Sequence, residues 1–529
     1  MNLIYLITNQ KNTMKNIILP FLLYMFTLQV IGQDKLKVPV TDIYIGRNFI
    51  TNTDIGAKRY DFKENIYKWG VDDSTKMMTL QFRGTMDNGT DLKDSGSIVL
   101  VDFTTGEMRW KQEVDFRNTT IDQYDSLIIK TDGNISTCMN VATGETIWSA
   151  KYTLCYINPH IRVGSGYSVS PEEDGIKNIV GIDLTTGKSM WKRKINKDFT
   201  LNEFIPLNDS VILFSANGLH LAQLKTGKGW DYNSRTGKKD YSGTIASNII
   251  NLTFSILLGN DFEVTSGHDL ISGVVSNTLV DSTGIYVADN RSIVKMDRTG
   301  NEIWHNKLPK NQVSRSTLIF KDYMIVMVND GFALLNSELV KYGTPFIAAY
   351  DKNTGKQFFF SKAGYKNDQI LSYKIQQDTV FLLTKKRVMK YSVKDGTEIW
   401  ERYFKTDSLG ELSQFGGNQL YIKKDSALIS PVCSSPNSVS VFNDRNELLV
   451  LDYYLKTTDV IPNDQLYTCY LKSKKYSFID NGISTVVTDD TNQPVAILDI
   501  SGNSVLIGSK LFEVQGKSLV VIDIDQFNH

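Results

Sequence analysis

The sequence predicts an all-β protein, a β-propeller of seven or eight four-stranded blades with eight favoured. A short unit recurs along the chain: a strand, a turn containing Gly, and a second strand that reaches an aromatic residue. Its clearest copy is GIDLTTGKSMW, Gly181 to Trp191. Most copies are about 40 residues apart, which is the length that four short strands and their turns occupy. No stretch shows the three- and four-residue apolar spacing of a helix.

Composition fits one folded chain without a strongly charged surface. The 529 residues include 58 basic and 58 acidic residues, and 41% are hydrophobic. A zero net charge excludes a global field that would attract nucleic acid, so we expect no nucleic-acid partner. Length alone favours several domains, but one propeller can occupy the whole chain. We therefore predict a single propeller over residues 33–529, with its strongest repeats in 77–402 and degenerate blades in 403–529.

The N-terminus carries a predicted export signal. Lys15 precedes an apolar run from Ile17 to Ile31, and cleavage is expected after Gly32. Residues 1–13 read as an upstream extension, so residues 1–32 form the predicted leader. A membrane anchor is the alternative, but the run is shorter than the roughly 20 residues that a spanning helix needs. We expect a periplasmic or extracellular monomer with no membrane span in the mature chain.

The four cysteines suit an oxidising compartment without defining a pairing. They are Cys138, Cys155, Cys433 and Cys469, and four cysteines allow three pairings. Pairing of neighbours along the chain and four free thiols both remain open. Their spacing matches no zinc pattern.

Strands are expected from the N-terminal side onward wherever β-branched and aromatic residues lie between Gly, Asp or Asn. The first are 42–50, 77–82, 97–101 and 126–129, and strands at 447–452 and 519–523 continue beyond the last clear repeat. The repeat turns contain Gly106, Gly144, Gly187, Gly227, Gly300, Gly355 and Gly396, followed by Trp110, Trp148, Trp191, Trp230, Trp304, Phe359 and Trp400. The long interval between Trp230 and Trp304 predicts a degenerate blade within 241–280. The interval from Trp304 to Phe359 predicts a loop insertion.

Each residue type that recurs in the repeat has a structural reason. Gly takes the positive backbone angle that a tight turn between antiparallel strands requires. The Thr or Asp before it can hydrogen-bond the turn backbone. The indole offers a large apolar area and one donor for a neighbouring blade. We therefore assign a structural docking role to Trp110, Trp148, Trp191, Trp304 and Trp400.

The pattern of strand, Asp, Thr-Gly-Lys/Glu and Trp resembles the tryptophan-docking motif of the pyrroloquinoline quinone (PQQ)-like propeller repeat. That superfamily includes quinone-dependent dehydrogenases and the non-enzymatic outer-membrane assembly propellers, and this chain is more similar to the latter. Two copies depart from the motif, since Lys225 replaces the usual Asp and Phe359 replaces Trp. The resemblance implies eight blades, the last of which can close on a strand from the N-terminus.

Three connections are longer than the others, and all three are expected between the second and third strands of a blade. They are 84–96, 164–176 and 331–345. Equivalent connections of a propeller emerge on the same face, so these should build a rim on one side. The rim predicts binding of a protein or glycan through Asp87, Asp91, Asp94, Tyr167, Glu172, Glu173, Asn336, Glu338 and Tyr342.

Enzyme motifs are absent from the sequence. It has no adjacent Cys pair, no haem-attachment motif and no Gly-x-Ser-x-Gly. Its five histidines lack metal-ligand spacing, and residues 87–91 lack the closing Glu of a calcium loop. We therefore predict no catalytic residue, cofactor or metal, and an exported binding or scaffolding propeller. The alternative is a quinone-dependent oxidoreductase with PQQ and calcium near the propeller axis.

Overall fold

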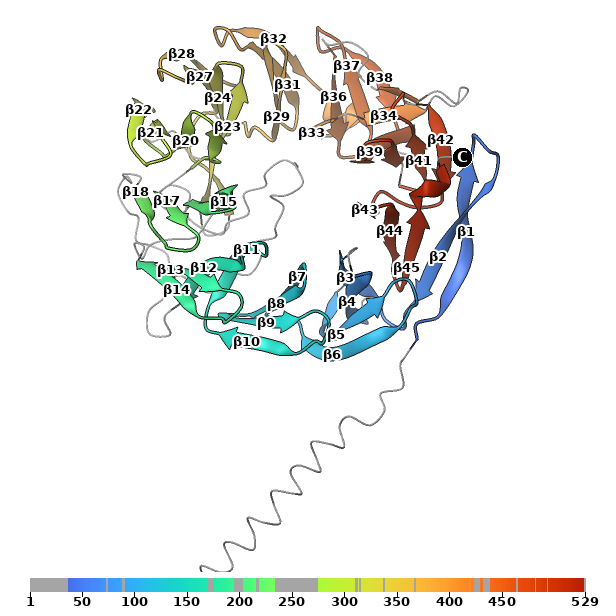
Figure 1. The fold of residues 1–529 in the computed structure, drawn as a ribbon. Coiled ribbons are helices and arrows are strands. Elements are labelled where there is room, and N and C mark those ends of the chain that lie inside the picture. The colour runs from blue at the N-terminus through green and yellow to red at the C-terminus, as the bar shows by residue number, and fades with distance from the viewer. Residues whose placement is uncertain are drawn as a thin grey trace, which may run out of the picture.

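A computed structural model shows antiparallel sheets arranged as a closed ring (Figure 1). The predicted β-propeller is confirmed. The structure describes residues 37–72, 75–87, 91–169, 176–194, 203–215, 218–233, 275–309, 313, 315–335, 338–365, 368–417, 419–422, 429–431, 438–462, 465–480, 482–491 and 493–527.

Within the described residues, eight sheets have four antiparallel strands each, and the blade count is about eight, as favoured. The first four are β3 (Ile66–Asp72), β4 (Met77–Thr85), β5 (Leu92–Asp102) and β6 (Met108–Asp115); β7 (Thr119–Tyr124), β8 (Leu127–Asp132), β9 (Ile135–Asn140) and β10 (Thr146–Ala150); β11 (Thr153–Asn158), β12 (Val163–Val169), β13 (Ile176–Asp183) and β14 (Ser189–Lys194); and β15 (Glu203–Asn208), β16 (Val211–Ser215), β17 (Gly218–Gln223) and β18 (Gly229–Asn233).

The next four sheets follow in chain order. They are β19 (Leu279–Asp281), β20 (Gly284–Ala288), β21 (Ser292–Met296) and β22 (Glu302–Lys307); β23 (Ser316–Lys321), β24 (Met324–Asn329), β27 (Phe346–Asp351) and β28 (Gln357–Lys362); β29 (Ser372–Gln376), β30 (Thr379–Leu383), β31 (Arg387–Ser392) and β32 (Glu398–Tyr403); and β33 (Leu412–Phe415), β36 (Val439–Asn443), β37 (Leu448–Leu451) and β38 (Thr457–Ile461).

An eleven-stranded sheet joins the two ends of the described chain and closes the ring. Strand β2 pairs with β45 through Ala57 and Ile522, and β1 pairs with β42 through Gly46 and Leu498. The implied closure on an N-terminal strand is therefore correct. The strands, in sheet order, are β35 (Ile429–Pro431), β34 (Gln419–Ile422), β39 (Leu466–Lys472), β40 (Ser477–Asp480), β41 (Thr485–Thr488), β42 (Pro494–Leu498), β1 (Val40–Asn48), β2 (Asp54–Asp61), β45 (Ser518–Asp523), β44 (Lys510–Gln515) and β43 (Val505–Ile507).

The two long intervals between repeats have different outcomes. The predicted insertion before Phe359 is present as a two-stranded hairpin of β25 (Phe332–Leu335) and β26 (Glu338–Lys341). The proposed degenerate blade in 241–280 lies mostly outside the described residues. The sheets on either side are direct neighbours, because Trp230 Nε1 donates to Arg298 O at 2.9 Å. Leu213 and Val287 of these sheets also share one core cluster, so no further blade separates them.

Tryptophans connect successive blades through one recurring contact. The indole lies over the Gly turn of the next sheet, and its Nε1 donates to a carbonyl there. The bonds are Trp110 to Val141 (2.7 Å), Trp148 to Leu184 (2.6 Å), Trp191 to Leu224 (2.7 Å), Trp230 to Arg298 (2.9 Å) and Trp304 to Lys352 (3.3 Å). The turn therefore needs Gly for two reasons. At Gly227, φ is 68°, and a Cβ atom would lie 2.5 Å from Trp191 Cδ2.

A second contact between blades, which the sequence did not reveal, is made by the side chain two residues beyond the docking aromatic residue. At this position Gln112 and Asn306 donate to the carbonyls of Gly144 and Gly355, the turn glycines of the next blades. Arg193 Nη1 donates to Gly227 O at 3.2 Å and to Leu221 O at 2.8 Å. These side chains satisfy turn carbonyls, so these three blade junctions have both an apolar and a polar contact.

Burial between the sheets raises the pKa of three core tyrosines, Tyr60, Tyr167 and Tyr286, to about 12. In the unfolded chain their pKa is about 10. Between pH 10 and 12 the unfolded chain therefore loses protons that the fold keeps, and the free energy of unfolding must fall as pH rises. We expect tyrosinate absorbance to appear together with loss of β-sheet circular dichroism. Complete tyrosine titration near pH 10 with the fold intact would contradict this.

Three cysteines are free thiols, and Cys433 lies outside the described residues. Local pairing of Cys138 with Cys155 is therefore not formed. Cys138 packs in the core cluster with Trp148, whereas Cys155 contacts the cluster of Tyr167, on another side of the sheet β11–β14. Cys469 is exposed.

Helical structure in the described residues is confined to the short α2 (Thr406–Leu409) and the 3₁₀ turn η2 (Ile524–Phe527). Within the same residues, no helix is long and apolar enough to span a membrane.

Candidate interaction face

The ring has two faces that carry different connections. Each chain segment enters its sheet on the first strand, so the connections between second and third strands share one face, here named the loop face. The Gly turns between third and fourth strands share the other, here named the turn face. The three long connections predicted from sequence join β4 to β5, β12 to β13 and β24 to β27, which places all of them on the loop face.

The longest continuous hairpin on the loop face is formed by β4 and β5. These strands pair as far as Thr85 and Leu92, whereas the outer strand β6 pairs with β5 only as far as Asp115 and Ser95. The hairpin therefore extends past the end of its blade. Its tip closes with a hydrogen bond from Met86 N to Asp91 O at 2.7 Å, and the Met86 side chain is 44% exposed.

A stacked arginine supports the base of this hairpin. The guanidinium of Arg83 lies 5.0 Å from the ring centroid of Tyr67 and 5.4 Å from that of Phe116. Its Nε donates to Lys93 O at 2.8 Å, across the hairpin. Cation–π contacts of a partly desolvated Arg are each worth about 1 kcal/mol, so these contacts stiffen the hairpin where it leaves the blade.

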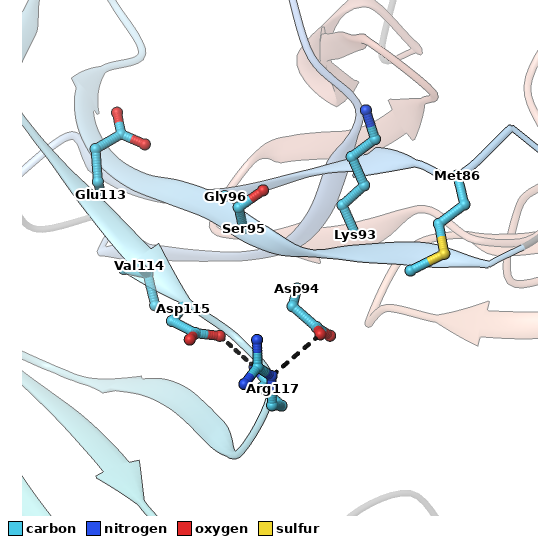
Figure 2. Close-up of a pocket in the computed structure, with 9 residues that line it drawn as sticks. All are labelled: Met86, Lys93, Asp94, Ser95, Gly96, Glu113, Val114, Asp115 and Arg117. Atoms are coloured by element: carbon cyan, nitrogen blue, oxygen red, sulfur yellow. Dashed lines mark hydrogen bonds and ion pairs between the residues drawn. The ribbon is translucent and has the colours of Figure 1, made fainter.

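A pocket of about 550 Å³ opens beside the hairpin (Figure 2). Asp94 projects into the region of Arg117, with its Oδ2 3.4 Å from Arg117 Nε. Asp115 Oδ1 accepts a hydrogen bond from Arg117 N at 3.0 Å. The lining combines both charge signs with apolar surface: Met86, Lys93, Asp94, Ser95, Gly96, Glu113, Val114, Asp115 and Arg117.

The same stacking arrangement recurs on the sheet β29–β32. The fully buried guanidinium of Arg387 lies 4.2 Å from the Tyr365 ring centroid and 5.1 Å from that of Tyr403. It forms ion pairs with Asp368 and Glu401. Tyr365 and Tyr403 remain 62% and 61% exposed, so the loop face carries rigidly held aromatic rings here as well.

An ion pair fixes the base of the β25–β26 hairpin. Arg315 Nη2 lies 2.6 Å from Asp330 Oδ2, directly before the hairpin. Burial raises the pKa of Asp330, against the opposing effect of Arg315. Tyr342 N, directly after β26, donates to Gly331 O, directly before β25, at 3.0 Å. The two ends of the insertion are thereby joined at its base.

The predicted binding residues occupy separate blades of the loop face and do not form one cluster. Asp87, Asp91 and Asp94 belong to the β4–β5 hairpin, while Glu338 lies in β26 and Tyr342 directly follows it. Figure 1 shows the sheets that carry them, β3–β6 and β23–β28, at distant positions of the ring. Glu172, Glu173 and Asn336 lie outside the described residues.

Tyr167 requires a correction. It was expected on a loop, but it lies in β12, is only 7% exposed and packs with Ile179 and Phe214. Strand pairing continues through Gly164 and Gly166 to Ser168, so the connection is shorter than the sequence suggested. Tyr167 belongs to the core between two blades.

Several residues of the face were missed by sequence reasoning. Arg83, Glu113, Asp115 and Arg117 surround the hairpin and its pocket. Arg83 directly precedes the interval from Gly84 to Gly96 that defined the loop, and the other three lie in or just after β6. The sequence signal that could have identified these residues is the run of charged residues at the end of the repeat strand, beyond the docking Trp.

The described residues contain no group of three or more His, Cys, Asp or Glu arranged to hold a metal ion. His220 is buried and pairs with Asp231 at 2.6 Å, and Asp231 also pairs with the interblade Arg193. His305 is exposed and pairs with Glu302. These contacts tie each histidine to a carboxylate of its own sheet.

Comparison with known proteins identifies the family. Residues 81–247 and 289–430 match the family described as "Outer membrane protein assembly factor BamB". No curated protein sequence matches the chain.

Solved structures similar to the chain include the following three. BamB from Moraxella catarrhalis is 12% identical with a TM-score of 0.33, covering 73% of this chain and 99% of that chain. AztD from Citrobacter koseri is 10% identical with a TM-score of 0.31, covering 70% and 92%. A quinohemoprotein alcohol dehydrogenase from Pseudomonas putida HK5 is 10% identical with a TM-score of 0.32, covering 74% and 70%.

The family assignment rests on the sequence match, which spans more than half of the chain and agrees with the docking motif. The chain belongs to the family of the outer membrane protein assembly factor BamB, within the PQQ-like propeller superfamily.

Proposed function

We propose that this protein is an exported scaffold that binds a partner protein through the loop face and takes part in outer membrane protein assembly. The observation that carries the proposal is the β4–β5 hairpin, which extends past its blade and borders a pocket of about 550 Å³. The family description supports an assembly role. The proposal includes export by residues 1–32, a monomeric protein, and no cofactor.

The mechanism is rigid presentation of binding groups. The stacked Arg83 and the ion pair of Arg315 with Asp330 hold both hairpins before a partner arrives. Ordering a loop on association costs free energy, so a surface that is already ordered retains more of its contact energy for affinity. Exposed Met86 and Tyr365 offer apolar contacts, and the Lys, Arg and Asp side chains around them set specificity.

A protein partner fits this surface better than a glycan. The hairpins lie on separate blades of the ring, so an occupant that contacts both must span much of the face. A folded domain has that extent, and a standard protein interface buries about 800 Å² on each partner. The pocket beside β5 then receives one side chain of the partner.

Site-specific photocrosslinking tests the proposal. A photoreactive residue replaces Met86 or Tyr365 on the loop face, and Thr186 or Thr354 on the turn face provides the matched control. All four side chains are exposed. We expect one defined envelope protein to be crosslinked from both loop-face positions and from neither control. Crosslinking of that protein from the turn-face positions instead would refute the assignment of the face.

A further inference from the structure

The sheet of β33, β36, β37 and β38 meets strand β39 of the closing sheet at a junction without a docked tryptophan, here named the β38–β39 junction. No tryptophan follows Trp400 in the sequence. In β38, Asp459 stands at the docking position, because it pairs with Val450 beside a bulge as Trp110 pairs with Leu100. Asp459 is exposed, whereas Trp110 is only 8% exposed. Strand β38 therefore places no aromatic ring on the next sheet.

The next sheet nevertheless has a turn of the kind that receives a tryptophan elsewhere. Between β41 and β42, Asp489 Oδ1 accepts hydrogen bonds from Thr491 N at 2.9 Å, Thr491 Oγ1 at 2.7 Å and Gln493 N at 2.8 Å. Asp297 Oδ1 accepts the equivalent three bonds in the turn on which the ring of Trp230 packs. The two turns therefore share one pattern of hydrogen bonds.

The two turns differ at the position of the glycine. Asn492 follows Thr491 in the sequence where Gly300 follows Thr299, and Asn492 itself lies outside the described residues. At Gly300 a Cβ atom would lie 2.4 Å from Trp230 Cδ2, so the ring packs there only on a residue without a side chain. The β38–β39 junction thus lacks both the Trp and the Gly of the docking contact.

Apolar packing at this junction is also small. Its core cluster has four buried residues, Leu448, Val450, Ile461 and Leu466. The other core clusters of the described residues have at least seven, and the cluster between the sheet β29–β32 and β33 has ten. The free energy of a local opening follows the apolar area that it exposes, so this junction should open more readily than the others.

A main-chain contact links the two sheets. Strands β34 and β35 lie between β33 and β36 in sequence, yet β34 pairs with β39 (Figure 1). The paired residues are Gln419 with Thr468, Leu420 with Tyr467 and Tyr421 with Leu466. The β34–β35 hairpin therefore keeps β39 tethered to the sheet of β33, β36, β37 and β38 when the small cluster separates.

We propose that the β38–β39 junction is a hinge of the ring. The sheet of β33, β36, β37 and β38 separates there from β39 by local opening, while β34 holds the two sides together and the junctions with docked tryptophans stay closed. The hinge is a property of the fold, so it does not depend on the binding role of the loop face.

Amide hydrogen exchange of the full-length mature protein, followed by mass spectrometry, tests the hinge. The matched strands are β10 and β11, which flank the junction of docked Trp148. Within the described residues β39 pairs on both edges and β11 on one, so a closed junction would give β39 the slower exchange. We expect β38 and β39 to exchange at least about tenfold faster than β10 and β11. Equal or slower exchange would overturn the proposal.

Rebuilding the docking contact tests whether its absence causes the opening. One variant combines Asp459→Trp with Asn492→Gly, and Asp459→Ala with Asn492→Gly is the matched control without the ring. We expect only the Trp variant to slow exchange in β38 and β39 to the rate of β10 and β11 and to raise the melting temperature. Unchanged exchange in that variant, or equal slowing in the control or in all sheets, would contradict the proposal.

Discussion

Gly227→Ala is expected to lower the free energy of unfolding by about 3 kcal/mol, although it adds a single methyl group. The new Cβ would lie 2.5 Å from Trp191 Cδ2, and the residue must keep a φ of 68°. The docking ring must therefore move away from the turn, which also disturbs the hydrogen bond from Trp191 Nε1 to Leu224 O. Chemical denaturation followed by circular dichroism measures the effect.

Gly133→Ala provides the matched control. Its φ of 55° imposes the same backbone strain, but no atom lies within 4 Å of the added Cβ. We expect a loss of about 1 kcal/mol, which is the backbone contribution alone. Equal losses for both variants would show that the tryptophan contact contributes little, and the docking interpretation of the repeat would fail.

Trp148→Ala should destabilise the protein by about 3–5 kcal/mol, because it removes a large buried ring from a blade junction. Trp148 is 8% exposed, and its Nε1 donates to Leu184 O at 2.6 Å. Trp400 occupies the same position of its own blade but is 43% exposed. Trp400→Ala should therefore cost well under half as much.

Thermal and chemical unfolding of the two tryptophan variants, measured side by side, decides this comparison. The difference between them isolates burial, because the residue type and the place in the repeat are the same. Similar losses would mean that Trp400 also acts as a docking residue. They would contradict the explanation that buried Leu455, with φ of 59°, takes the place of a turn Gly and leaves Trp400 exposed.

The repeat made most of the fold predictable, because its information is local. A Gly that must take a positive φ and a Trp at fixed spacing define a turn and a junction without knowledge of distant residues. The long interval before Phe359 likewise indicated an insertion. By contrast, the eleven-stranded sheet depends on pairing between β2 and β45, which are more than 450 residues apart, and only the family resemblance anticipated it.

The candidate site was predictable in position but not in detail. The three long connections could be placed on one face from the sequence, because this placement follows from strand order alone. Strand ends, however, depend on pairing partners: Gly84 and Gly96 lie within strands, and Tyr167 is buried. The stacking of Arg83 between Tyr67 and Phe116 joins three separate segments, so no local pattern could indicate it. Leu455 has φ of 59° in the turn between β37 and β38, where other repeats have Gly. The sequence could not indicate this, because that turn lacks the repeat motif.

Replacement of the β4–β5 tip tests most directly whether binding resides in the loop face while the docking tryptophans serve stability. An Asn-Gly turn in place of residues 86–91 retains the pairing of Thr85 with Leu92. Crosslinking from Tyr365 and the melting temperature are measured on the same preparation. We expect the melting temperature to stay within a few degrees of wild type and the crosslink to the partner to be lost. An undiminished crosslink would contradict the assignment of binding to this face.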